Sequence, residues 1–304
     1  MAFIKNRVRN FSIIDWINFL FLIIVTLFYL IAFPTTPYRW IYLVLLIALY
    51  LFLFVMSALR PAEGSASGLK RFLMFFYPVI FLIAAFESFY MILPYCNPER
   101  YDAFMAAVDF HLLGVHPTVW IESYIQPPVT ETLYFAYILY FPMPLVLAGW
   151  MYGKQMFNEV AAIFLSFFIC YYGAYISYFL VPVQGPRFHL AHLQHVPLDG
   201  IFFSETIRNL INILEPNKLD AFPSLHAAIL LLSMIAAKKY NRTLYRIFLP
   251  VAILITVSLV YLRYHYVIDV VAGFTWAGIS WFSGQYLYRR FCGRFPPHFY
   301  RKER

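Results

Sequence analysis

Long apolar stretches recur along the whole chain, and most are long enough to cross a lipid bilayer. A helix needs roughly 20 apolar residues to span the hydrocarbon core, and hydropathy places such stretches at residues 12–33, 40–59, 72–93, 129–152, 158–181, 224–237, 244–262 and 266–288. Only 12% of the 304 residues are charged and 62% are hydrophobic, a balance far from that of a soluble domain. The sequence therefore predicts an integral membrane protein, an all-α helical bundle of about eight spans.

The Lys and Arg residues fall unequally on the two sides of this predicted bundle. With eight spans both termini lie on one side, which receives 17 of the 23 Lys and Arg residues against 6 on the other. Loops rich in these residues stay in the cytoplasm, so the count predicts that both termini are cytoplasmic. The sixth stretch is short for a span, at 14 residues. It is kept as a span because the unequal division of Lys and Arg between the two sides is lost without it. Cytoplasmic anchoring also explains the net charge of +8, so no nucleic acid partner is implied.

The loops divide the chain into four expected parts. Residues 1–68 would form a two-span accessory region that ends in a loop of small residues. Residues 69–128 would supply the third span and short helices on the extracytoplasmic membrane surface, which are interpreted more readily as a structural cap than as a substrate lid. Residues 129–288 carry the polar motifs described next. Residues 289–304 form a basic cytoplasmic tail, suited to contact with anionic headgroups.

A histidine and an aspartate stand four residues apart at the start of the last apolar stretch. If a helix runs through His265 and Asp269, the two side chains share one face. The carboxylate could then accept a hydrogen bond from one imidazole nitrogen and leave the other free to attack a substrate. The alternative interpretation is an interfacial histidine with a capping aspartate.

A second histidine follows a helix-starting motif. Ser224 is suited to cap a helix and Pro223 to occupy its first turn, so the helix would present free N–H groups as an anion site. His226, two residues further on, could donate a proton to a leaving oxygen. By itself, a histidine in this place is commonly just a polar helix end.

Two arginines accompany the histidines. Arg187 follows Gly185 and Pro186 at the outer end of the fifth stretch, and Arg263 precedes His265 by two residues. A planar guanidinium binds phosphate oxygens in a two-pronged contact, although an arginine at an interface can also be a snorkelling charge. The charge count places both arginines and both histidines on the same extracytoplasmic or lumenal face, which favours a common site.

Three further polar side chains are candidates for binding a headgroup, namely Asp220, His189 and Glu87. Asp220 lies just before the His226 motif, and Glu87 lies within the third stretch, where a carboxylate is costly. His189 begins a run that continues with His192 and His195. If helical, the run would form a polar stripe for a polyol headgroup, but an interfacial loop is the simpler interpretation. No metal or cofactor is expected, because no carboxylate completes this run and the cysteines lack ligand spacing.

In these motifs the chain resembles the type-2 phosphatidic acid phosphatase superfamily of membrane lipid phosphatases and phosphotransferases. The family pattern has three blocks, Lys-x6-Arg-Pro, Pro-Ser-Gly-His and Ser-Arg-x5-His-x3-Asp. The chain keeps most of the second and third blocks, as Pro223-Ser224-Leu225-His226 and as Ser258, His265 and Asp269. The resemblance covers roughly residues 130–288 and implies a six-span catalytic core preceded by two N-terminal spans.

Two cations of the family pattern are missing. The lysine of the first block would fall at Leu180, and the arginine of the third block at Leu259. These departures, together with Leu225 in place of glycine and Arg263 close to His265, are more similar to the inositol phosphorylceramide synthase branch. Sphingomyelin synthases share a similar last block. The inositol phosphorylceramide synthase branch transfers a phosphoryl headgroup between lipids rather than simply hydrolysing it, so the resemblance favours a transferase.

The resemblance implies a mechanism and a class of substrate. His265, oriented by Asp269, would form a phosphohistidine, and His226 would protonate the leaving oxygen. Arg187, Arg263 and the helix end at Ser224 would hold the phosphate charge. The substrate is then a phospholipid or other lipid phosphate, and a lipid or polyol acceptor makes the chain a phosphotransferase.

Two alternatives stay open at this stage. With water as acceptor, the chain is a lipid phosphate phosphatase of the same superfamily. An alternative of another class is a non-catalytic lipid-phosphate-binding protein or a transporter. The polar motifs gather at one membrane surface and no internal repeat is visible, which favours an enzyme over a transporter.

Overall fold

The computed structural model describes residues 11–61, 68–89 and 92–291, and nearly all the regular structure in these ranges is helical. This part of the chain contains no strand, only an isolated parallel bridge between Val183 and Asp220. The chain divides into two compact units. The first comprises Met1–Cys96, Met156–Tyr172 and Trp281–Arg304, and the second comprises Asn97–Gln155 and Gly173–Ser280. Two long helices, α10 (Phe157–Leu180) and α15 (Val267–Phe291), contribute to both.

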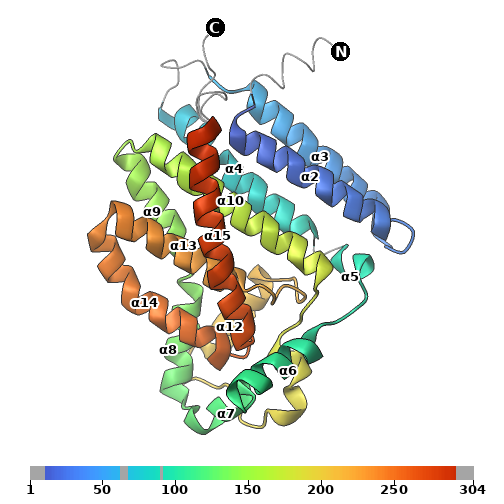
Figure 1. Ribbon diagram of the computed structural model, residues 1–304, viewed down its shortest axis with the longest axis vertical. Helices are drawn as coiled ribbons and strands as arrows, with labels where there is room; N and C mark the ends of the chain where they lie inside the picture. Colours follow the sequence, from blue (N-terminus) through green and yellow to red (C-terminus); the bar gives the residue numbers. More distant parts are fainter. Residues whose placement is uncertain (1–10, 62–67, 90–91, 292–304) are drawn as a thin grey trace. The chain divides into compact units, whose positions relative to one another are not determined.

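The first unit contains the hydrophobic helices of the N-terminal part of the chain (Figure 1). They are α2 (Ile13–Ala32), α3 (Arg39–Ala58), α4 (Gly68–Phe89) and the short α5 (Leu93–Cys96). Helix α2 begins with a capping box, in which the side chain of Ser12 accepts from the amide of Asp15 and the Asp15 carboxylate accepts from the amide of Ser12. Two amide groups that a helix start leaves unpaired are satisfied in this way.

A buried ion pair joins the ends of these helices. The Arg60 guanidinium lies 2.5 Å from the Asp15 carboxylate, and neither side chain is exposed to solvent. The hydroxyl of Tyr77 on α4 donates to the same carboxylate and accepts from Arg60 at 3.0 Å. Because a buried charge is costly when it is not compensated, this cluster ties α2 and α4 to the segment that follows α3.

We expect Asp15→Ala to destabilise the protein by about 3–5 kcal/mol, because it leaves the buried Arg60 charge without its carboxylate. Unfolding of the purified protein in detergent measures this effect. Ser12→Ala is the matched control, since it removes the helix cap and one hydroxyl bond to Asp15 but leaves the ion pair in place, and it should cost about 1 kcal/mol. Equal losses in the two variants would show that the ion pair contributes no more than the cap.

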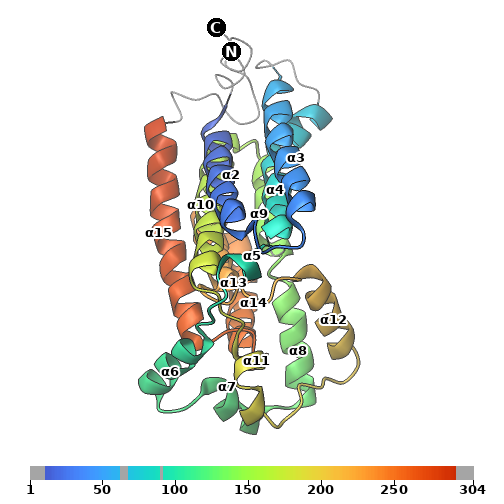
Figure 2. The same ribbon diagram turned by 90° about the vertical axis from the view of Figure 1, so that its right-hand side faces the viewer.

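The second unit contains the shorter helices that carry the polar motifs (Figures 1 and 2). They are α6 (Asp102–Leu113), α7 (Pro117–Trp120), η1 (Ile121–Tyr124), α8 (Pro127–Ile138), α9 (Pro142–Gly153), α11 (Pro186–His189), η2 (Ala191–Leu193), α12 (Ser204–Leu214), α13 (Leu225–Tyr240) and α14 (Arg242–Tyr261). Helix α14 packs against α8 and α13, and α12 packs against α8. Buried aromatic and aliphatic side chains between these helices form the core of the unit.

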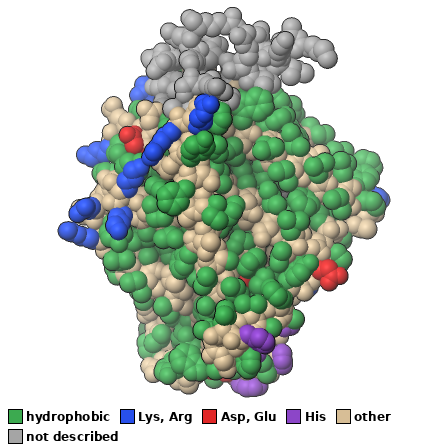
Figure 3. All heavy atoms as spheres, viewed as in Figure 1, with side chains coloured by type: hydrophobic (Ala, Val, Ile, Leu, Met, Phe, Trp, Pro, Cys, Tyr) green, Lys and Arg blue, Asp and Glu red, His purple; other side chains and the backbone are tan. Residues whose placement is uncertain are grey.

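The described helices fit a membrane protein. Six of them, α2, α3, α4, α10, α14 and α15, are long and apolar enough to cross a bilayer, and there are up to eight spans if each of two bent helix pairs counts as one. The bent pairs are α8 with α9, bent by 41°, and α6 with α7 and η1, bent by 69°. Hydrophobic side chains cover much of the face drawn in Figure 3, as expected for helices in contact with lipid. The all-helical membrane architecture is thus confirmed.

Besides the bend between α8 and α9 within the stretch 129–152, two expectations differ from the helices. The sixth stretch, residues 224–237, is α13, which has 16 residues and is shorter than the helices that pass as spans. It ends because Asn241 leaves the helical conformation and caps α14, accepting from Thr243 and Leu244. The segment from Pro94 to Pro128 is expected to form short helices on the membrane surface, yet residues 102–124 within it are apolar enough for a broken span. The four-part division of the chain and the cytoplasmic termini stay predictions.

Candidate active site

His226 is positioned by the start of α13. The helix begins at Leu225, and its cap is Ser224, whose hydroxyl accepts from the amide of Ala227 at 3.3 Å. The prediction of Ser224 as the cap therefore agrees with the structure. Pro223, expected in the first turn, precedes the cap and lies outside the helix, because the turn starts one residue after Ser224.

His265 lies in the turn between α14 and α15. Arg263 adopts a left-handed backbone conformation with φ 64°, and the amides of Tyr264 and His265 both bond back to the carbonyl of Leu259. Helix α15 begins only at Val267. The expectation of one helical face for His265 and Asp269 is therefore wrong, because the turn delays the helix by two residues beyond His265.

The turn nevertheless brings His265 close to its expected partner. The Nδ1 atom of His265 lies 3.6 Å from Oδ2 of Asp269, and this carboxylate oxygen accepts from the amide of Tyr266 at 2.9 Å. A nearer acceptor for Nδ1 is the carbonyl of Ala221, at 3.0 Å. Since a carbonyl can only accept, this contact assigns the proton of the ring to Nδ1 and leaves Nε2 with its lone pair.

The two histidines face each other. Nε2 of His265 lies 3.3 Å from Nδ1 of His226, and the ring centroids are 5.4 Å apart. Burial, and after it the neighbouring His226, holds the pKa of His265 well below its ordinary value. His265 is therefore neutral over the physiological range, which is the state in which an imidazole nitrogen acts as a nucleophile.

A carboxylate that the sequence did not reveal contacts the second histidine. Oε1 of Glu215 lies 2.8 Å from Nε2 of His226, and the hydroxyl of Tyr137 donates to Oε2 of Glu215 at 3.0 Å. Burial acts to raise the pKa of Glu215, but the charge of His226 and the hydrogen bonds outweigh it and lower the pKa below its ordinary value. Glu215 thus stays ionised against the ring of His226. Its position just after an amphipathic helix gives no local signal of this role.

Aromatic rings hold this pair in place. The ring of Tyr137 on α8 stacks on Tyr264 with centroids 4.7 Å apart, and the ring of Tyr140 lies 4.5 Å from His226.

Two close approaches of the backbone near the site need glycine. A Cβ on Gly185 would lie 2.6 Å from the carbonyl oxygen of Tyr264, and a Cβ on Gly273 would lie 2.3 Å from the carbonyl oxygen of Ser224. The turns carrying Arg187, Ser224 and Tyr264 are packed closely for this reason.

Arg187 lies beside the histidine pair. Its guanidinium lies 4.5 Å above the ring of Tyr264 and 4.8 Å from that of Phe188, and its amide donates to the carbonyl of Arg263. The buried Nε of Arg187 has no hydrogen-bond partner among the described residues. The charge of Arg187 is felt by Glu215 and Asp220, so this cation is placed to receive an anionic substrate.

Arg263 is committed to a protein partner. Its guanidinium lies 2.6 Å from the carboxylate of Glu122 and donates to the carbonyl of Val196 at 2.7 Å. A direct phosphate contact by Arg263 stays a prediction. In this structure Arg263 connects η1 and the loop that contains Val196 to the turn that carries His265.

The two positions of the missing cations hold apolar side chains. Leu180 is largely exposed and Leu259 is fully buried in the core of the second unit. Two cations that the sequence argument did not single out are Arg208, which bonds to Tyr134, and Lys218, whose Nζ donates to the carbonyl of Glu215. They add positive charge near the histidine pair from a different part of the chain.

The three headgroup candidates have different surroundings. Asp220 is half-buried next to Ala221, and burial followed by the charge of Glu215 raises its pKa to about 7. His189 ends α11 and lines a cavity described below. The side chain of Glu87 lies outside the described residues. The run from His189 to His195 is not one helix, because α11 ends at His189 and a separate 3-10 turn follows. No three His, Cys, Asp or Glu side chains within the described ranges are placed to hold a metal.

The fold and these residues define a class, a helical membrane protein that gathers two histidines, their carboxylates and several cations near the start of its last helix. The family model described as the PAP2 superfamily matches residues 110–283. The match covers more than half of the chain, so the chain belongs to this superfamily. No curated protein and no solved structure matches it. Membership confirms the superfamily resemblance and indicates a lipid phosphatase or phosphotransferase that acts on lipid phosphates in a bilayer.

Proposed function

We propose that the protein is a lipid phosphotransferase similar to inositol phosphorylceramide synthases. In this reaction a phosphoryl headgroup passes from a donor phospholipid to the hydroxyl of an acceptor through a phosphohistidine on His265. The observation that carries the proposal is the histidine pair, in which Nε2 of the buried His265 faces Nδ1 of the partly buried His226 at 3.3 Å. The two rings belong to different turns, and each is fixed on its other side by an oxygen acceptor.

The roles of the two histidines rest on their partners. A carboxylate partner alone does not distinguish them, because Glu215 is closer to His226 than Asp269 is to His265. The distinction comes from the atoms that each ring contacts. His265 is neutral with a free Nε2, which suits a nucleophile, whereas Nε2 of His226 lies 2.8 Å from the Glu215 carboxylate, a negative partner that suits a general acid.

The first half of the reaction cleaves the donor lipid. Nε2 of His265 forms a bond to phosphorus while the bond from phosphorus to the leaving alkoxide oxygen breaks. The proton of His226 passes to that oxygen, so the departing group is a neutral alcohol. A phosphorus atom does not fit between nitrogens 3.3 Å apart, so substrate binding has to separate the two rings.

The second half transfers the headgroup. The acceptor hydroxyl forms a new bond to phosphorus, the nitrogen–phosphorus bond breaks, and the acceptor proton returns to His226. Asp220 is a candidate for holding the acceptor, since it makes no hydrogen bond to another side chain among the described residues and its pKa of about 7 lets it accept or share a proton near neutrality. Arg187 and the amides at the start of α13 would hold the charge on the equatorial oxygens.

Product analysis tests the proposal. The purified protein is incubated in mixed micelles with a radiolabelled inositol phospholipid or, separately, with a radiolabelled lipid phosphate monoester, each with and without a ceramide-type acceptor, and His265→Ala is run in parallel. Appearance of a new labelled phospholipid only when the acceptor is present would support transfer. Release of free phosphate from lipid phosphates in both conditions would favour a phosphatase of the same superfamily. Absence of both products, with retained lipid binding, would favour the non-catalytic alternative.

A further inference from the structure

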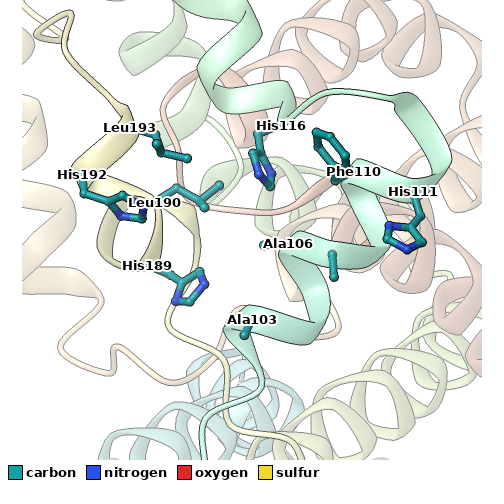
Figure 4. Close-up of a pocket in the computed structure, with 10 residues that line it drawn as sticks. Ala103, Ala106, Phe110, His111, His116, His189, Leu190, His192 and Leu193 are labelled. Atoms are coloured by element: carbon teal, nitrogen blue, oxygen red, sulfur yellow. The ribbon is translucent and has the colours of Figure 1, made fainter.

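A second group of histidines surrounds an open cavity of about 370 Å³ in the second unit (Figure 4). Helix α6 forms one wall, and α11 with η2 forms the other. Four of the eight histidines of the chain line it, and the remaining lining residues are apolar. The histidines are His111, His116, His189 and His192, and the apolar residues are Ala103, Ala106, Ala107, Phe110, Leu190 and Leu193.

The wall formed by α6 is fixed to the segment that carries His265. The Asp102 carboxylate accepts from the amide of Gly185 and from the hydroxyl of Tyr266. About two turns later, the Asp109 carboxylate accepts from the amides of Val267 and Ile268 at 2.8 and 2.9 Å. Both carboxylates accept hydrogen bonds from backbone amides, and neither lines the cavity. The cavity therefore has a rigid wall and no lining residue with a negative charge.

The donors around the cavity favour an anion over a metal. An imidazole ring has at least one N–H to donate, and the cavity lining contains four imidazole rings and no carboxylate. His116 lies against the ring of Phe110, and its Nδ1 is buried without a hydrogen-bond partner in the described part of the chain. A buried polar atom without a partner is costly, and a ligand in the cavity is able to satisfy it. The histidines are not placed to hold a metal together.

The surface around the cavity favours a lipid as the carrier of that anion. The floor of alanine and leucine side chains is apolar, and large apolar side chains are exposed on both walls. These exposed residues are Phe104, Leu112 and Leu113 on α6 and Phe188 on α11. Such side chains accompany elements that enter a membrane, and α6 belongs to a bent pair that is apolar enough to do so. A phospholipid whose headgroup binds the histidines would have its acyl chains along α6.

We propose that this cavity is a second lipid site, which binds the phosphate of an anionic phospholipid through the imidazole N–H groups of its four histidines. The site is separate from the histidine pair and does not take part in the bond-making steps. It goes beyond the proposed function, since it requires neither His265 nor His226.

Native mass spectrometry of the full chain tests the site. The protein is reconstituted with phosphatidylcholine alone or with added phosphatidic acid, and retained lipids are counted. Wild type should retain one more phosphatidic acid than His189→Ala/His192→Ala, and the double variant should bind it at least about tenfold more weakly, because two hydrogen bonds to a charged group are lost. His195→Ala is the matched control. It changes an exposed histidine of the same segment outside the cavity and should retain lipid like wild type.

Further arms identify the ligand. Inorganic phosphate that displaces the lipid at equal concentration would show that the site takes a free anion and would overturn the lipid proposal. Zinc binding to wild type and not to the double variant, with equal lipid retention by the two proteins, would overturn the lipid proposal in favour of a metal site. Equal retention by wild type and the double variant would also overturn it. Each comparison is run in the His265→Ala background, which removes the proposed nucleophile and so prevents consumption of phosphatidic acid, and the outcomes are then independent of whether the protein transfers or hydrolyses phosphate.

Discussion

Replacing His265 by alanine is expected to abolish turnover while the protein stays folded. The nucleophile forms the bond to phosphorus, so its loss removes the covalent route, and we expect a fall of at least about 10⁴-fold, by analogy with removal of other catalytic nucleophiles. Steady-state transfer with a labelled phospholipid measures this fall, and the unfolding temperature in detergent checks the fold.

A trapping experiment tests the same role directly. A phosphohistidine is stable in alkali and labile in acid, so wild type quenched during turnover should carry label with this behaviour, and His265→Asn should carry none. Asparagine keeps a side-chain N–H for the carbonyl of Ala221, the acceptor that orients the ring, and so separates loss of the nucleophile from loss of packing. Label on His265→Asn, or turnover above a hundredth of wild type in His265→Ala, would contradict the assignment.

Hydropathy predicts the long helices of this chain because a membrane span must be apolar along its whole length. The stretch at 244–262 corresponds closely to α14, Arg242–Tyr261. The prediction is poorer where a span is broken. The single stretch at 129–152 is two helices bent by 41°, and Pro142 begins the second of them, because proline lacks the amide that would continue the first.

The histidine pair could be predicted because each histidine lies in a recognisable local motif. Glu215 and Tyr137 could not, since only the tertiary fold brings them to His226. Tyr137 is one of 25 tyrosines and lies 89 residues from His226. The sequence also predicted the His265–Asp269 contact from helical spacing, whereas a turn that begins at a left-handed Arg263 produces it. Local patterns thus identify the residue types, and the turns and packing decide which atoms meet.

His226→Ala is expected to show a defect that depends on the leaving group. A general acid contributes about 10²–10⁴-fold when the leaving oxygen is an alkoxide that needs a proton. In an aryl ester of the same lipid phosphate, the leaving group is a phenolate, which departs without needing a proton. We therefore expect His226→Ala to lose about 10²–10⁴-fold on the natural alkyl substrate and much less on the aryl substrate. His265→Ala should lose activity on both.

Glu215→Gln distinguishes an acid role for His226 from a purely structural one. The variant keeps the size of the side chain and removes the charge that lies 2.8 Å from Nε2 of His226, so it should show the same leaving-group dependence with a smaller loss. Because the pKa of Glu215 is lowered in the folded protein, its carboxylate persists as the pH falls, and activity that depends on it is lost only in more acidic solution. Glu215→Gln should lack this acidic limb in its profile of kcat/KM against pH. Equal losses of His226→Ala on alkyl and aryl substrates would contradict proton donation and assign His226 to positioning the phosphate.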